Sequence, residues 1–235
     1  MKTNRKYAFI AGFALLFMAV LAAFSFGYAH NNLVIPGNAY ATVSNLRFSS
    51  LLFKTEIVGW LAILFLDVVV AWSLYLFFKS NNPKLSLLTA ALRIFYTIIF
   101  GAAILNLLHI LPFLNGSSSE NAKAQILFHL NSFDTTWSFA LIIFGFHLLV
   151  LGILVLQSKS IHNFWGLLLV FAAVCYTVIN SAKFLLPEFE NQVATAEMIL
   201  SLPMAFGEVG FAFWLIIRGG EPRIVYRQTK AVVMS

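Results

Sequence analysis

Charged residues are scarce in this sequence. Asp, Glu, Lys and Arg make up 10% of its 235 residues, whereas soluble domains carry roughly 25%. Apolar residues reach 60% and the mean hydropathy is +0.87, so too few polar side chains remain to cover a soluble core. These values exclude a soluble enzyme, a nucleic-acid-binding domain and a disordered chain. They predict a protein that crosses the lipid bilayer several times.

Cysteine and catalytic motifs are also sparse. The single cysteine, Cys175, can form no disulfide within the chain, and no Cys/His cluster has the spacing of a metal site. GxSxG, HExxH, P-loop and dinucleotide-binding signatures are missing from the sequence. We therefore expect no metal, no cofactor and no nucleic-acid partner, and no motif marks the chain as an enzyme.

Six apolar runs are each long enough to cross a membrane as a helix, which takes about 20 residues. They predict an all-α polytopic membrane protein, a six-helix bundle forming a single domain over residues 1–235, with a short tail over residues 219–235. The first run is too long for a signal peptide and lacks a small-residue cleavage site, so we expect it to be retained; its removal would leave five helices. The expected spans are residues 7–28, 57–78, 85–113, 137–156, 164–186 and 198–217.

Lys and Arg are distributed unevenly among the connections. The two chain ends and the two short connections hold ten of the fifteen, and the three long connections hold three. Because Lys and Arg accumulate on the cytoplasmic side of a membrane, both termini and the tail are expected to be cytoplasmic. The long connections carry apolar stretches at residues 51–53 and 126–128, which predict short helices on the membrane surface. Near the span ends, Trp60, Trp137 and Trp165 are placed as an aromatic belt would be.

Four ionisable residues lie deep in four different spans: Asp67, Arg93, His147 and Glu208. Each is about 13–18 Å from the cytoplasmic end of its helix, at 1.5 Å per residue. Charges in a membrane are costly and are usually paired, so we expect these four to converge, with Arg93 bonded to Asp67, Glu208 or both.

Two interpretations of this buried polar cluster remain open. It can be a structural lock that fixes the register of the helices. It can instead line a pathway for a small solute or a proton, since transporter sites lie near the midplane between helices. The sequence does not distinguish the two interpretations, and it does not indicate an oligomeric state.

A second polar group is expected near the opposite face of the membrane. Asn106 and His109 share one helix face, and Asn180 and Lys183 repeat that spacing in the fifth span. The alternative function is therefore a membrane-embedded enzyme, or a protein that binds a lipid or cofactor in an extracytoplasmic pocket; ordinary interfacial residues would explain the same pattern. The neighbouring connections add His30, His129, Asp134 and Glu188.

Several stretches of the chain resemble a bacterial integral membrane family catalogued as domain of unknown function 4386. The resemblance runs from about residue 7 to residue 219 and includes all four members of the buried cluster. It implies six helices in the bacterial cytoplasmic membrane and assigns no activity. The stretches that carry it are residues 67–75, 82–88, 144–149 and 166–168, together with Arg93, Tyr96, Phe133, Asp134, Trp137, Gly152, Gly207, Glu208, Trp214 and Gly219.

Overall fold

A computed structural model describes residues 2–114 and 119–220, and every regular element in those ranges is a helix. Six helical segments are long and apolar enough to cross a membrane, which confirms the predicted all-α bundle with six spans. The tail expected from residue 219 lies, from residue 221 on, outside the described residues. The long helices are α1 (Lys2–Ala22), α4 (Ser50–Phe78), α5 (Pro83–Leu114), α6 (Glu120–Gln157), α7 (Asn163–Leu185) and α8 (Glu190–Arg218).

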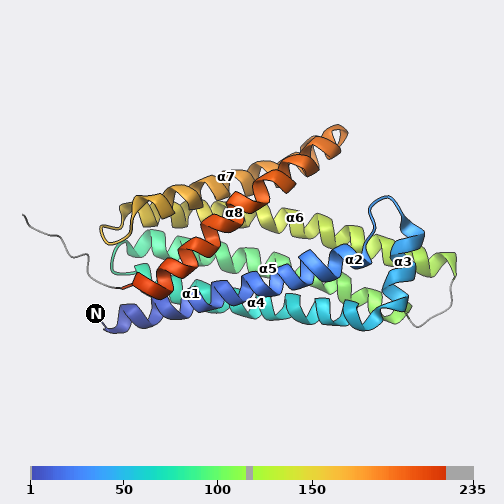
Figure 1. Cartoon of the computed structure of the whole chain (residues 1–235), viewed down its shortest axis with the longest axis horizontal. Coiled ribbons are helices and arrows are strands. Elements are labelled where there is room, and N and C mark those ends of the chain that lie inside the picture. The colour runs from blue at the N-terminus through green and yellow to red at the C-terminus, as the bar shows by residue number, and fades with distance from the viewer. Residues whose placement is uncertain (1, 115–118, 221–235) are drawn as a thin grey trace, which may run out of the picture.

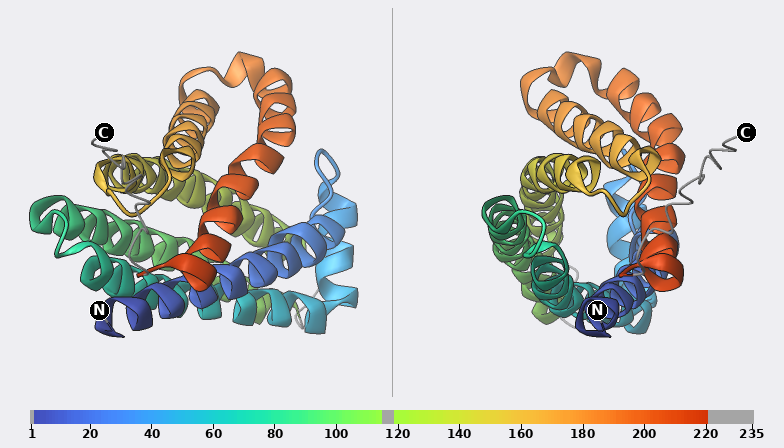
Figure 2. Two further views of the ribbon diagram at one scale, coloured as in Figure 1. Left: turned by 60° about the vertical axis from the view of Figure 1, so that its left-hand side comes forward. Right: turned by 90° about the vertical axis from the view of Figure 1, so that its left-hand side faces the viewer.

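The six long helices form a closed ring. Each packs against the next along the chain, and α8 returns to pack against α1 (Figure 2). The start of α1 and the end of α8 lie together at one end of the bundle (Figure 1), which we call the proximal end; the opposite end is the distal end. The guanidinium of Arg5 joins these two helices, because it donates hydrogen bonds to the carbonyls of Leu215, Ile216 and Gly219 at the end of α8.

Glycine residues allow two pairs of helices to approach closely. A Cβ placed on Gly152 of α6 would lie 3.0 Å from the carbonyl oxygen of Gly166 on α7, and one placed on Gly12 of α1 would lie 2.7 Å from that of Ala212 on α8. Small residues of this kind are favoured where membrane helices touch, since they let the backbones come together. The close contacts of α6 with α7 and of α8 with α1 therefore depend on residues without side chains.

At the distal end, α4, α6 and α8 begin well before the expected spans. Past α1 the chain continues through a π-helical segment, η1 (Ala23–His30), into the short α2 (Asn31–Leu33). A turn at Gly37, with φ at +73°, leads to α3 (Ala39–Phe48), and α4 follows at once. After α7, a single 3₁₀ turn over Pro187–Phe189, η2, leads into α8.

The two apolar stretches expected as separate surface helices were misassigned. Residues 51–53 belong to the first turn of α4, and residues 126–128 lie inside α6. Ser119 explains the early start of α6, since its side chain accepts a hydrogen bond from the backbone N–H of Ala122 and caps the helix. The helical hydrogen bonding then continues without a break into the span.

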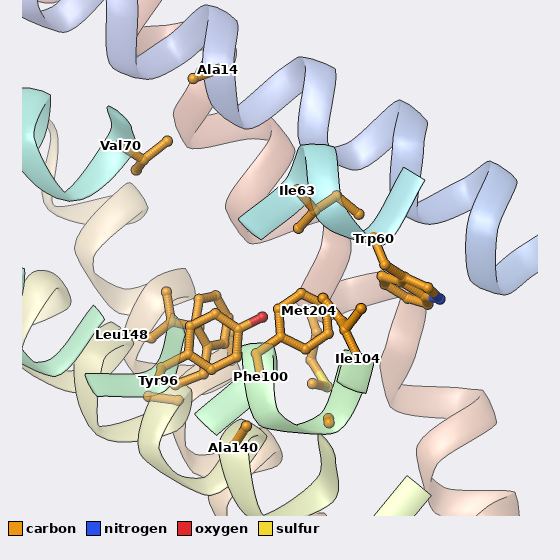
Figure 3. Close-up of a cluster of buried hydrophobic side chains, with 14 of the residues drawn as sticks. Ala14, Trp60, Ile63, Val70, Tyr96, Phe100, Ile104, Ala140, Leu148 and Met204 are labelled. Atoms are coloured by element: carbon orange, nitrogen blue, oxygen red, sulfur yellow. The ribbon is translucent and has the colours of Figure 1, made fainter. Parts of the chain in front are cut away.

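An aromatic layer fills the distal half of the core. The Trp60 and Phe100 rings meet edge to face at 5.6 Å, and Tyr96 stacks on Phe100 at 5.8 Å; Figure 3 shows them with Ile63 and Met204. Trp60 is only 2% exposed. Its assignment to an interfacial aromatic belt was therefore wrong, because its ring packs among aromatic neighbours inside the bundle.

Candidate functional site

The buried site is built on an ion pair between neighbouring helices. Nη2 of Arg93 lies 2.6 Å from Oδ1 of Asp67, and Nε donates to the same oxygen at 2.9 Å. Asp67 on α4 is 0% exposed and Arg93 on α5 is 2% exposed. This is one of the pairings that the sequence predicts. The second carboxylate oxygen, Oδ2, has no hydrogen-bond partner in the described part of the chain.

His147 extends the ion pair to α6. Its Nδ1 lies 2.9 Å from the carbonyl oxygen of Thr89, and its Nε2 lies 3.2 Å from Nη1 of Arg93. A carbonyl can only accept and a guanidinium can only donate, so Nδ1 carries the proton and Nε2 accepts. His147 is therefore a neutral imidazole in this arrangement, and Arg93 bonds side chains from two other helices.

Arg93 also contacts an aromatic ring of α6 and a methionine of α1. The guanidinium lies over the ring of Phe144, 5.5 Å from its centroid, and Nη2 lies 3.8 Å from the sulfur of Met18 on α1. One turn along α5, the hydroxyl of Thr97 donates to the carbonyl of Arg93 at 2.7 Å. Arg93 thus contacts α1, α4 and α6 as well as its own helix.

Glu208 is near this group but is not bonded to it. No hydrogen bond or ion pair in residues 2–114 and 119–220 joins it to Arg93, although both line one small cavity. The space open to the centre of a water molecule is about 10 Å³, near the minimum for one buried water. Glu208 is half-buried and interacts with Tyr176 of α7. The remaining lining residues are Leu15, Leu74, Leu148, Leu151, Leu169 and Phe211.

The residues of the polar group expected at the distal side make separate contacts. Nδ1 of His129 on α6 lies 3.4 Å from Oδ1 of Asn106, and the His109 and His129 rings are 5.2 Å apart. On α7, Lys183 forms an ion pair with Glu197 of α8 at 2.8 Å.

Asn180, which was expected to act with Lys183, is bonded within its own helix, α7. Its side-chain amide donates to the carbonyl of Tyr176. Within the described residues, no hydrogen bond or ion pair connects Asn106 or His109 with Asn180 or Lys183.

A second buried carboxylate, which the sequence pattern did not predict as a site residue, lies at the distal end. Glu56 on α4 is 0% exposed. Its Oε1 lies 2.8 Å from Nδ1 of His30 and accepts from Nε1 of Trp60 at 3.2 Å. The sequence placed His30 and Glu56 at the ends of a connecting segment. The signal that could have found them is the spacing of Glu56, Trp60 and Asp67 along α4, which puts all three on one helix face.

Six apolar helices that close into a ring around a buried ion pair define a multi-pass α-helical membrane protein. The chain belongs to the family described as Domain of unknown function (DUF4386), whose model matches residues 10–219. It is also similar to a protein of Archaeoglobus fulgidus described as "Uncharacterized protein", with 29% identity over 164 residues, which cover 70% of this chain and 83% of the relative. No solved structure matches the chain.

Proposed function

We propose that this membrane protein binds a proton or a small cation between Glu208 and Arg93, as one step of a transport pathway. The observation that carries the proposal is the cavity that these two side chains share without bonding each other. Oppositely charged groups in a low-dielectric interior attract strongly. A separation between them is therefore informative, because it leaves room for a water or a small ion.

The charges at the site favour a positively charged ligand. Asp67 and Arg93 neutralise each other through the 2.6 Å contact, and the hydrogen bonds of His147 make it neutral. Glu208 then contributes an uncompensated negative charge. A proton on the Glu208 carboxylate, or a cation beside it, would restore neutrality, and an uncompensated charge inside a membrane costs several kcal/mol.

Glu208 and Arg93 are held by different neighbouring helices. Helix α8 packs against α1 and α7, whereas Arg93 is bonded to residues of α4 and α6. Movement of α8 would therefore change the distance between Glu208 and Arg93 without breaking the ion pair with Asp67. In this proposal the bonds among Asp67, Arg93 and His147 act as a structural lock, while Glu208 is the responsive group.

The location of the protein is part of the proposal. The distribution of Lys and Arg supports both termini in the cytoplasm, and the family resemblance supports the bacterial cytoplasmic membrane. The lipid bilayer is then the main partner, with a proton or small solute as the ligand.

Proton movement through reconstituted protein tests the proposal. Liposomes that contain a pH-sensitive dye are given an inside-negative potential, and internal acidification is followed. We expect the wild-type protein to acidify the interior faster than protein-free liposomes, and the Glu208→Gln variant to match the protein-free rate. Glu197→Gln is the matched control, since Glu197 lies on the same helix but pairs with Lys183. Wild-type behaviour of Glu208→Gln, or an inactive wild type, would overturn the proposal.

A further inference from the structure

The carboxylate of Glu56 is enclosed at the distal end of the bundle. Its Oε1 receives hydrogen bonds from the His30 imidazole and the Trp60 indole, while Oε2 is buried and has no partner among the described residues. Its partner His30 is packed between aromatic rings: Phe26 stacks on His30 at 5.6 Å, and Phe133 lies 5.8 Å from the same ring. Glu56 is therefore an acid in an apolar enclosure whose polar contacts satisfy only one of its two oxygens.

His30 connects this enclosed acid to a more exposed one. Its Nε2 lies 3.9 Å from Oδ1 of Asp134 on α6, whose side chain is 51% exposed. This separation is too long for a direct hydrogen bond but suits a bridging water. The two nitrogens of one imidazole therefore face two carboxylates, one buried and one accessible. An imidazole can bind a proton at one nitrogen and release one from the other.

The position of Asp134 along α6 places it at the surface of the bilayer. It lies 23 residues before Gln157, the last residue of α6 at the proximal end, which corresponds to about 35 Å of helix. The hydrocarbon core of a bilayer is about 30 Å thick. Water can therefore reach Asp134. Glu56 lies on the other side of the His30 ring, in the interior of the bundle.

We propose that Asp134, His30 and Glu56 form a proton relay that loads Glu56 from the distal side. A proton delivered through Asp134 and a water forms an N–H bond at Nε2 of His30. The N–H bond at Nδ1 then breaks, and its proton forms an O–H bond on the Glu56 carboxylate. The imidazole is left neutral with the proton on Nε2. To restore the starting tautomer, Nε2 releases that proton to water and Nδ1 binds a proton from water.

The surroundings of the relay favour a proton over a metal ion. Among the described residues, no group of three His, Cys, Asp or Glu side chains is arranged to hold a metal. Lys183 of α7 also acts on the relay, because it contributes a positive charge near Asp134. The relay uses different residues from the site of Arg93 and Glu208. Along α4, the buried residues Trp60 and Ile63 lie between Glu56 and Asp67, and the Trp60 ring packs against Phe100, on which Tyr96 stacks.

Infrared difference spectroscopy after a rapid pH drop tests the relay on the full chain in detergent. Protonation of Glu56 produces a carboxylic C=O stretch, which is assigned by comparing the wild type with Glu56→Gln because the exposed acids contribute to both spectra. We expect this band in the wild type and in Glu208→Gln, and its loss in Glu56→Gln. We expect His30→Gln to slow its rise by about tenfold or more, as for the loss of a positioned acid–base group, and Asp134→Asn to slow it as well.

Glu120→Gln is the matched control, because Glu120 is an exposed carboxylate that pairs with Lys123 on the same helix; its spectra should match the wild type. Wild-type elution and helical circular dichroism establish that each variant is folded. The relay is overturned if Glu56→Gln keeps the band, or if His30→Gln shows the wild-type rate. If Glu208→Gln retains the band, the relay does not depend on Glu208, and the relay and the proposed transport step can fail independently.

Discussion

Glu56 and Asp67 lie eleven residues apart on α4, which is three helical turns, so both carboxylates face the interior of the bundle. Each has one oxygen that is bonded and one that is buried without a partner in the described ranges. Between them on the same face are Trp60 and Ile63, both buried. A single helix thus carries two separate buried acids with an apolar segment between them.

The ion pair predicts a non-additive response to mutation. Arg93→Leu leaves Asp67 buried without its counter-ion, and we expect a loss of about 3–5 kcal/mol in the free energy of unfolding, as for other broken buried pairs. The double variant with Asp67→Leu removes both charges and should lose less. Chemical unfolding in detergent measures both values. Equal losses in the single and double variants would show that the two residues are not coupled.

The contact of α6 with α7 predicts that Gly152→Ala destabilises the protein. Its new Cβ would lie 2.7 Å from Cγ2 of Val170 and 3.0 Å from the carbonyl oxygen of Gly166. Overpacking of this kind typically costs about 1–3 kcal/mol. Gly27→Ala is the matched control, because nothing lies within 4 Å of a Cβ there. Thermal unfolding in detergent should show a lower midpoint for the first variant alone.

The bonds at the proximal end predict that Arg5 holds the end of α8 in place. Arg5→Ala removes a positive charge from three carbonyls at the helix C-terminus, where cations are favourable. We expect a lower unfolding midpoint and faster proteolytic cleavage near Arg218. Lys6→Ala, at a neighbouring exposed position, should behave as the wild type. Equal cleavage of the two variants would argue against this role of Arg5.

The proposed orientation predicts the location of the C-terminus. A reporter fused after Ser235 should be active in the cytoplasm, because most Lys and Arg residues lie at the chain ends and in the short connections. A second reporter inserted at Gly37, in the turn before α3, should report from the opposite side. Activity of the first reporter outside the cytoplasm would reverse the proposed orientation.

The pairing of Asp67 with Arg93 could be predicted because two general constraints apply to it. The short connection between α4 and α5 makes the helices neighbours, and the cost of a membrane-buried charge requires a partner at similar depth. His147 was placed in the same group by depth alone. Its exact bonds could not be predicted, because they depend on helix rotation set by packing, including the contact of its Nδ1 with the Thr89 carbonyl.

The separation of Glu208 from Arg93 could not be predicted from depth. It depends on the position of α8, which is set by close contacts such as that of Gly210 with the Trp165 ring. The distal acid was missed for a different reason. His30 and Glu56 were assigned to a connection, whereas helical structure continues to His30 through the π-helical segment and α4 begins at Ser50. Buried side chains were therefore interpreted as loop residues.

The closure of the ring by α8 against α1 has a consequence for biogenesis. Chain synthesis proceeds from the N-terminus, and the earlier segments form first. Gly12 of α1, which contacts Ala212, and Arg5, which bonds the end of α8, therefore lack these partners until the last span has been inserted. Until then, the cavity beside Arg93 lacks the wall that Glu208 and Phe211 of α8 supply.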